Sequence, residues 1–150
     1  MDYKLLCSQL EALAGEEGFH VSLLSNASAL LFGALSEVNW AGFYLMRNGQ
    51  LTLGPFQGKT ACIHIPLNRG VCGAAARQDA TQRVADVHAF PGHIACDSAS
   101  RSEIVVPIHH EGRVVAVLDI DSPVPDRFSA GDQAGLEAFV KCLEQHLEWD

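Results

Sequence analysis

Two pairs of apolar segments, each joined by a short turn, constrain the fold of this chain more than any other feature. Residues 103–108 and 113–121 are rich in Val and Ile and flank a short turn segment, which is typical of a β-hairpin. Residues 39–46 are aromatic and apolar, and the Asn48-Gly49 pair after them favours the tight turn of a second hairpin, with 51–53 as the returning strand. Two hairpins predict an antiparallel sheet rather than a doubly wound parallel one.

Helical patterns lie at both ends of the chain. Asp2 and Gly15 suit the start and the stop of a first helix, and Ser129 with Asp132 three residues later forms a capping pattern for a last helix. Apolar residues recur at helical spacing in the first helix, in a second helix that follows it, and in the last helix. These residues are Leu6, Leu10 and Leu13; Val21, Leu24, Leu31 and Leu35; and Leu136, Phe139, Val140, Leu143 and Leu147.

Shorter elements separate the two hairpins. Residues 62–65 are consistent with a short strand, and residues 70–77 with a glycine- and alanine-rich helical turn. The predicted order is therefore α-α-β-β-β-α-β-β-β-α. We expect an α+β fold in which an antiparallel sheet carries the terminal helices on one face. Because no linker or repeat interrupts the chain, residues 1–150 are expected to form one domain.

The composition excludes several classes of function. A formal net charge of −8, with the Lys and Arg residues scattered, lacks the basic surface of a nucleic acid binder. The first residues lack the basic and apolar segments of a signal peptide, and no apolar run approaches the length of a membrane span, so we expect a cytoplasmic protein. Five cysteines in such a protein argue against a structural disulfide framework, and any disulfide should be transient.

Cys96 lies in a polar, turn-forming loop, residues 86–100, where an exposed and reactive thiol is expected. The competing interpretation is a small buried residue, which is the usual role of an intracellular cysteine. An unassisted thiol is only about a few per cent thiolate at neutral pH, so a reactive Cys96 needs a cationic partner. His93 and Arg101 are the candidates for that partner.

The other four cysteines fall into two pairs. Cys62 and Cys72 lie upstream of the loop and could converge on Cys96 if the chain folds back, although their apolar neighbours also suit a structural role. Cys7 and Cys142 fall in the helical segments at the two ends and are expected to pack in the core. Three convergent thiols would indicate redox chemistry.

Asp119 and Asp121 stand two residues apart in an otherwise apolar strand. Alternation places both on one face of that strand, and Glu103 opens the neighbouring strand of the same hairpin. Buried together, three carboxylates would have raised pKa values unless a cation lies nearby, so they suit the ammonium group of a free amino acid. The alternative is that this end of the strand is exposed, because Asp-Ser-Pro is also ordinary turn chemistry.

Two further groups of residues have competing interpretations. Trp40 and Tyr44 share a strand face and either pack in the core or form a pocket wall for an apolar side chain. His88, His93 and Cys96 are suitable metal ligands but lack the close spacing of zinc sites, so no metal is expected. A zinc-stabilised structural domain is therefore the weakest of the interpretations.

With these residues in view, the chain resembles the free methionine-(R)-sulfoxide reductases, which are small proteins of the GAF fold. The Cys96 loop followed by Ser-Arg-Ser-Glu is the specific part, because ordinary GAF ligand sensors lack it. The likeness runs through residues 39–45, 53–59, 70–73, 81–84, 86–103 and 117–123. It implies an antiparallel sheet of about six strands, a usual sheet size, with terminal helices on one face and a ligand cleft on the other.

The resemblance also implies roles for individual residues. The catalytic thiol of the family corresponds to Cys96, and its two other redox cysteines correspond to Cys62 and Cys72. The family's substrate carboxylates correspond to Glu103, Asp119 and Asp121, and its aromatic wall to Trp40 and Tyr44.

The implied reaction is reduction of free L-methionine (R)-sulfoxide by a thiol. Cys96 would become a sulfenic acid, a second thiol would condense with it into a disulfide, and thioredoxin would reduce that disulfide. One of the three carboxyl groups would donate a proton to the sulfoxide oxygen, and the residues alone do not decide which. The family further implies a homodimer and no bound organic cofactor. The alternative function is a non-catalytic GAF module that senses a small amino-acid-like ligand.

Overall fold

The chain forms one antiparallel sheet flanked by helices, and the computed structural model describes residues 1–15, 17–93 and 99–149. Within these residues the sheet has six strands in the order β3-β2-β1-β6-β5-β4. The strands are β1 (Trp40–Arg47), β2 (Gln50–Gly58), β3 (His64–Ile65), β4 (Gln82–Val84), β5 (Ser102–His110) and β6 (Arg113–Ser122). The helices are α1 (Tyr3–Ala14), α2 (His20–Ala34), α3 (Gly70–Gln78), the short 3-10 helix η1 (Val87–Ala89) and α4 (Ala130–His146). The predicted α+β class and element order are confirmed.

Both predicted hairpins are present, β1–β2 and β5–β6, and each turns through two residues with left-handed backbone. Asn48 and Gly49 have φ values of 53° and 79°, and Glu111 and Gly112 have 53° and 76°. Two consecutive residues with positive φ fit the right-handed twist of the flanking strands. β1 then pairs with β6 in the centre of the sheet, so the two hairpins form one continuous surface.

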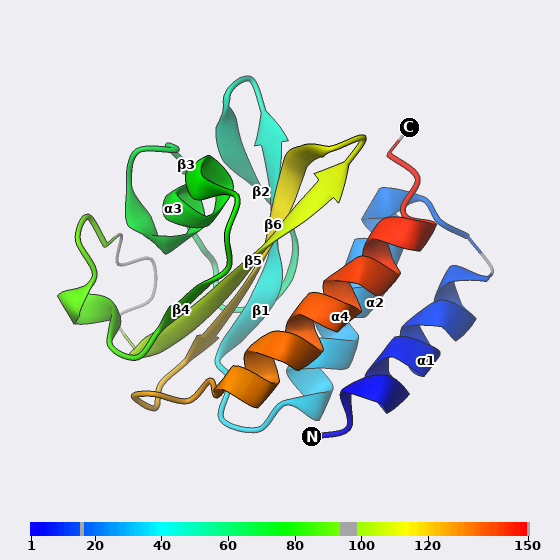
Figure 1. Cartoon of the computed structure of the whole chain (residues 1–150), viewed down its shortest axis with the longest axis horizontal. Coiled ribbons are helices and arrows are strands. Elements are labelled where there is room, and N and C mark those ends of the chain that lie inside the picture. The colour runs from blue at the N-terminus through cyan, green and yellow to red at the C-terminus, as the bar shows by residue number, and fades with distance from the viewer. Residues whose placement is uncertain (16, 94–98, 150) are drawn as a thin grey trace.

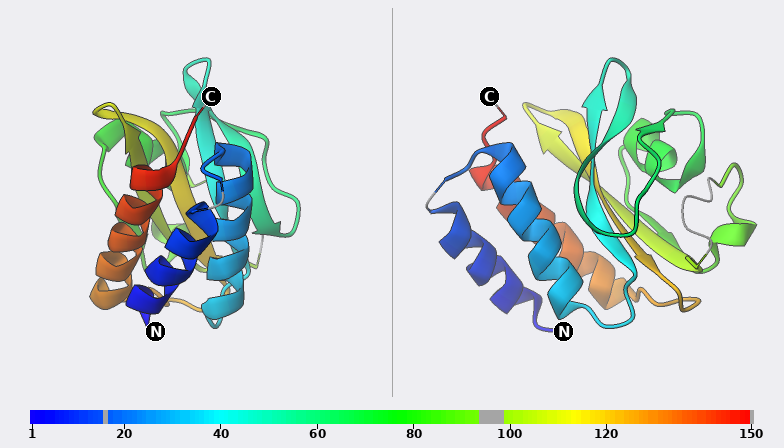
Figure 2. Two further views of the ribbon diagram at one scale, coloured as in Figure 1. Left: turned by 90° about the vertical axis from the view of Figure 1, so that its right-hand side faces the viewer. Right: turned by 180° about the vertical axis from the view of Figure 1, so that it is seen from behind.

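The helices divide unequally between the two faces of the sheet. Figures 1 and 2 show α2 and α4 against one face, with α1 outside them, while α3 lies on the opposite face. Alternate residues of β1 follow this division: Ala41 and Phe43 belong to the core beneath the terminal helices, and Trp40 and Tyr44 belong to a second core beneath α3. The prediction that the terminal helices share one face is confirmed. No helix in the described part of the chain has the length and apolar character that a bilayer span requires.

The predicted helix ends are also confirmed. The Asp2 side chain accepts a hydrogen bond from the Leu5 backbone nitrogen at 3.0 Å, and Gly15 is the C-cap that follows the last residue of α1, Ala14. Ser129 and Asp132 form the reciprocal capping box at the start of α4. Such caps satisfy backbone N–H groups that have no partner inside the helix.

Three details of the sequence prediction are wrong. Val21 is 45% exposed and Leu13 is 37% exposed, because both lie at the margin of their helix's buried face. On α2 the buried face includes Leu23 and Ala27 instead. The strand predicted for residues 62–65 begins only at His64, so Cys62 lies in the loop before β3.

A carboxylate–imidazole–carboxylate bridge connects the two sides of the sheet at one end. The His109 ring, at the end of β5, lies 2.5 Å from Asp79 through Nε2 and 3.1 Å from Glu144 through Nδ1. Asp79 caps the C-terminal end of α3 and Glu144 belongs to α4. Burial alone would lower the pKa of His109, but hydrogen bonds to the two carboxylates and their charges raise it above its ordinary value.

We predict that this bridge stabilises the fold more at acidic than at alkaline pH. Because the folded pKa of His109 is raised, its contribution is complete below the unfolded value of about 6.5 and disappears as the pH rises through the folded value. The unfolding free energy lost in His109→Gln should therefore be larger near pH 6 than near pH 9, measured by urea denaturation. An equal loss at both pH values would contradict the prediction.

Candidate active site

The face of the sheet that carries α3 also carries the predicted site residues. Strand register places Trp40 opposite Asp121 and Asp121 opposite Glu103. Asp119 and Tyr44 lie two and four residues away along β6 and β1, so the period of two keeps them on the same face. The predicted common face of the two aspartates is therefore present, and the aromatic and acidic residues lie on adjacent strands.

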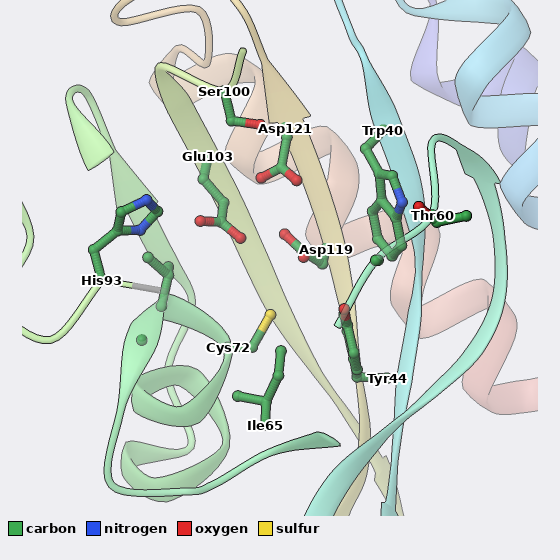
Figure 3. Close-up of a pocket in the computed structure, with 13 residues that line it drawn as sticks. Trp40, Tyr44, Thr60, Ile65, Cys72, His93, Ser100, Glu103, Asp119 and Asp121 are labelled. Atoms are coloured by element: carbon green, nitrogen blue, oxygen red, sulfur yellow. The ribbon is translucent and has the colours of Figure 1, made fainter. Parts of the chain in front are cut away.

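These side chains surround one pocket (Figure 3). Acidic groups from β5 and β6 line one side, the aromatic rings of β1 line the other, and the Cys72 sulfur from α3 reaches up from the base. The lining residues are Trp40, Tyr44, Thr60, Ala61, Ile65, Gly70, Val71, Cys72, His93, Ser100, Glu103, Asp119 and Asp121. The pocket thus combines an apolar wall, carboxyl groups and a thiol.

The aromatic wall is held by hydrogen bonds as well as by packing. The Trp40 and Tyr44 ring centroids are 5.8 Å apart with an interplanar angle of 24°. Trp40 Nε1 donates to the Lys59 carbonyl oxygen at 3.1 Å, and the Tyr44 hydroxyl donates to the Cys62 carbonyl oxygen at 2.9 Å. The loop that carries Cys62 is therefore fastened to this wall by its backbone.

One support of the aromatic wall was not found from the sequence. Phe56 of β2 stacks on Trp40, with ring centroids 5.1 Å apart. Its Cβ lies where a side chain on Gly42 would stand, since a Cβ built there would come within 2.2 Å. The Gly-Pro-Phe sequence in β2 was visible as a motif, but the register shift between Gly42 and Tyr44 that brings Phe56 to Trp40 is a tertiary feature.

The carboxyl groups are buried rather than exposed, which decides between the two alternatives for this strand end. Glu103 is 8% exposed and Asp119 is 5% exposed, while Asp121 is half-buried. Burial raises the pKa of Glu103 well above its ordinary value, and the charges of Asp119 and Asp121 raise it further. Burial also raises the pKa of Asp119, against a smaller lowering by Glu103 and Cys72. These carboxyl groups therefore keep a proton more readily in the pocket than they would in water.

Cys72 is a buried thiol in this acidic surrounding. It is 3% exposed and is the third residue of α3, a position where the helix dipole favours a thiolate. Burial and the neighbouring carboxylates outweigh that effect and raise the pKa of Cys72 well above its ordinary value. Because the thiolate is the nucleophilic form, this sulfur is a poor first nucleophile in this surrounding.

The remaining predicted residues lie in three places. Cys96 is outside the described residues, and Cys62 is half-buried in the loop before β3. His93 lines the pocket, and burial and the nearby His88 lower its pKa. Cys7 and Cys142 lie on α1 and α4, on the other side of the sheet from the pocket.

We predict that the buried acids reduce the stability of the protein. An acid whose folded pKa is raised opposes folding increasingly as the pH rises above its unfolded value, about 4.3 for Glu. Glu103→Gln should therefore unfold about 2 to 4 °C above the unaltered protein near pH 8, which corresponds to about 1 kcal/mol.

This difference should shrink near pH 4.5, because the acid is then largely protonated in both the folded and the unfolded states. Differential scanning calorimetry at both pH values measures it. Glu17→Gln, at an exposed position, is the matched control and should leave the unfolding temperature unchanged. A Glu103→Gln protein that is less stable than the unaltered one at pH 8 would contradict the prediction.

Comparison with known proteins assigns the family. Residues 24–148 match the GAF domain. The free methionine-R-sulfoxide reductase of Escherichia coli K12 is 53% identical over 90% of this chain and 81% of that protein. The reduced form of fRMsr of Staphylococcus aureus has a TM-score of 0.95 and 52% identity, covering 98% of this chain and 96% of that chain. Its complex with substrate has a TM-score of 0.93 and 51% identity over the same shares of the two chains. The chain belongs to the GAF domain family and, within it, to the free methionine-R-sulfoxide reductases.

Proposed function

We propose that this protein reduces free L-methionine (R)-sulfoxide to L-methionine. The observation that carries the proposal is the pocket itself, in which a stacked aromatic wall faces three carboxyl groups across a space that also contains a thiol. Family membership gives the substrate, and the substrate complex of the S. aureus protein covers 98% of this chain.

The pocket matches the two ends of a free amino acid. Glu103, Asp119 and Asp121 provide negative charge for the ammonium group, which a methionine residue inside a peptide lacks. The rings of Trp40 and Tyr44 offer an apolar surface to the methyl group beside the sulfoxide. The carboxyl groups on the acidic side of the pocket would thus select free methionine sulfoxide over a methionine sulfoxide residue in a peptide.

The chemistry requires a proton and a thiolate at the sulfoxide. The sulfoxide sulfur becomes a good electrophile when its oxygen accepts a proton, and a carboxyl group with a raised pKa supplies that proton near neutral pH. Glu103 and Asp119 are the two groups that burial prepares for this role. Attack by the Cys96 thiolate then transfers the oxygen to the cysteine, releasing methionine and leaving a sulfenic acid.

The resolving steps use the other two cysteines. We assign Cys62 as the thiol that condenses with the sulfenic acid, which forms a disulfide and releases water. Cys72 then exchanges with that disulfide and presents a new one to thioredoxin, which returns the two electrons. The high pKa and burial of Cys72 support a late role, since its sulfur becomes reactive only when α3 moves away from the carboxylates. In this scheme no bound organic cofactor takes part.

The setting of the reaction is part of the same proposal. Residues 1–150 would act as one GAF domain in the cytoplasm, where reductants keep the thiols available. We also propose a homodimer, as the family resemblance implies.

A second candidate is a non-catalytic GAF module that binds a small amino-acid-like ligand. It is favoured by one observation, the high pKa of the buried Cys72 thiol, which makes this sulfur unreactive in the closed pocket. Such a module would bind methionine sulfoxide without converting it.

Chiral chromatography of free L-methionine sulfoxide separates the two candidates. The reduced protein is incubated with both diastereomers and a thioredoxin system, and methionine formation is followed beside Cys96→Ser. We expect loss of the R form alone and no turnover with Cys96→Ser, which should still bind the substrate. Binding without loss of either diastereomer, by a reduced and folded sample, would favour the sensing module.

We predict that Cys62→Ser forms one equivalent of methionine rapidly and then stalls with thioredoxin. The first half-reaction needs only Cys96, whereas recycling needs the resolving thiol. Rapid-quench analysis of methionine per protein molecule measures the burst. Cys142→Ser changes a cysteine on the far side of the sheet and should turn over like the unaltered protein. Sustained turnover by Cys62→Ser would reject its role as the resolving thiol.

We also predict that N-acetyl-L-methionine sulfoxide is a poor substrate. Acetylation removes the positive charge that the carboxylates receive, so kcat/KM should fall by at least about a hundredfold, equivalent to about 2.7 kcal/mol. Competition between the acetylated and free forms in one assay directly measures the ratio of their kcat/KM values. Equal turnover of the two would show that the carboxyl groups do not bind an ammonium group.

A further inference from the structure

Three groups that commonly bind metals meet at the base of the pocket, each from a different element. Cys72 comes from α3, Glu103 from β5 and Asp119 from β6, and one sulfur or oxygen atom of each lies within 4.8 Å of the other two. Figure 3 shows the sulfur directed toward the two carboxyl groups. All three residues are more than nine-tenths buried, with exposed fractions of 3%, 8% and 5%.

An independent observation indicates that this cluster is built for a ligand. Asp119 Oδ1 is buried and has no hydrogen-bond partner among the described residues. A buried carboxylate oxygen without a partner is unfavourable unless a bound group completes its environment. The unpaired atom belongs to the same side chain that approaches Cys72 and Glu103.

We propose that the reduced protein binds Zn²⁺ through Cys72 Sγ and one carboxylate oxygen each from Glu103 and Asp119, with water as the fourth ligand. One thiolate with two carboxylates suits this borderline ion, whereas Mg²⁺ and Ca²⁺ prefer oxygen ligands alone. Tetrahedral Zn²⁺, with bonds of about 2.0 to 2.3 Å, places its ligand atoms about 3.5 Å apart. The three atoms, which lie within 4.8 Å of one another, would have to approach to that separation when the ion binds.

Bound Zn²⁺ would inhibit the reductase, and this part of the inference rests on the proposed function. The ion occupies the carboxylates that receive the substrate ammonium group, so Zn²⁺ and methionine sulfoxide compete. It also holds the Cys72 sulfur, which then is not available for disulfide exchange. Binding displaces protons from the ligands, so affinity rises with pH.

Co²⁺ titration of the reduced full-length chain, without methionine sulfoxide and under anaerobic conditions, tests the site. We expect one Co²⁺ per chain, with the thiolate-to-cobalt charge-transfer band and the visible spectrum of tetrahedral Co²⁺, both removed by added Zn²⁺. Cys72→Ser should lose the charge-transfer band. Asp119→Asn should weaken Zn²⁺ binding by at least about tenfold in calorimetry.

Control variants separate this site from other thiols. Cys142→Ser removes another buried cysteine, and Cys62→Ser removes a cysteine of the proposed redox set, so both should keep the spectrum. Circular dichroism verifies that each variant is folded. A band that survives Cys72→Ser, or that disappears with Cys62→Ser, would overturn the inference, as would the absence of any band in the folded, reduced protein.

The metal measurements and the reductase assay can reject the metal site and the reductase activity independently of each other. Turnover of the R diastereomer without Co²⁺ binding would reject the metal site and leave the reductase in place. Co²⁺ binding through Cys72 without any turnover would reject the reductase and leave the metal site.

Discussion

Strand β6 is covered on both faces, and the alternation of its side chains determines the rest of the structure. Leu118 and Ile120 face the core beneath the terminal helices, while Asp119 and Asp121 face the pocket. Burial of each large apolar side chain contributes about 1.5 to 3 kcal/mol, which offsets the cost of burying acidic groups on the other face. A register slip of one residue would move the acids into the helix-covered core and the apolar residues into the pocket. The pairing of β6 with β1 and β5 is therefore strongly specified.

The elements that depend on local chemistry were predictable from the sequence. The Asn48-Gly49 turn, the capping box of Ser129 and Asp132, and the helical spacing of α4 are each encoded within a few residues. The shared face of Asp119 and Asp121 follows from the strand period alone. These predictions needed no knowledge of what packs against each element.

What the sequence did not reveal depends on contacts between distant segments. Val21 has the right spacing for a buried stripe, but the position of α2 on the sheet leaves it outside. Phe56 stacks on Trp40 from across the irregular β1–β2 pairing, which the local sequence does not encode. Burial and carboxyl groups from two other elements raise the pKa of Cys72, against the lowering that a place near a helix N-terminus would give.

The carboxyl groups at the bottom of the pocket suit a bound cation, and they also change the chemistry of the thiol beside them. Burial and the same carboxyl groups that would receive an ammonium group or a metal ion raise the pKa of Cys72 well above its ordinary value. In the proposed exchange Cys72 would therefore react only once its sulfur has left this surrounding. At the opposite end of that helix, Asp79 contacts the His109 ring, and the same ring contacts Glu144 of α4.

At the start of α3, Gly70 adopts a φ of 73° that other residues rarely adopt. The His109 bridge, in contrast, holds the end of α3 that is remote from Cys72. A movement of the end of α3 that carries Cys72 would leave the helix-covered core in place, because the residues that form this core face the other side of β1, β5 and β6.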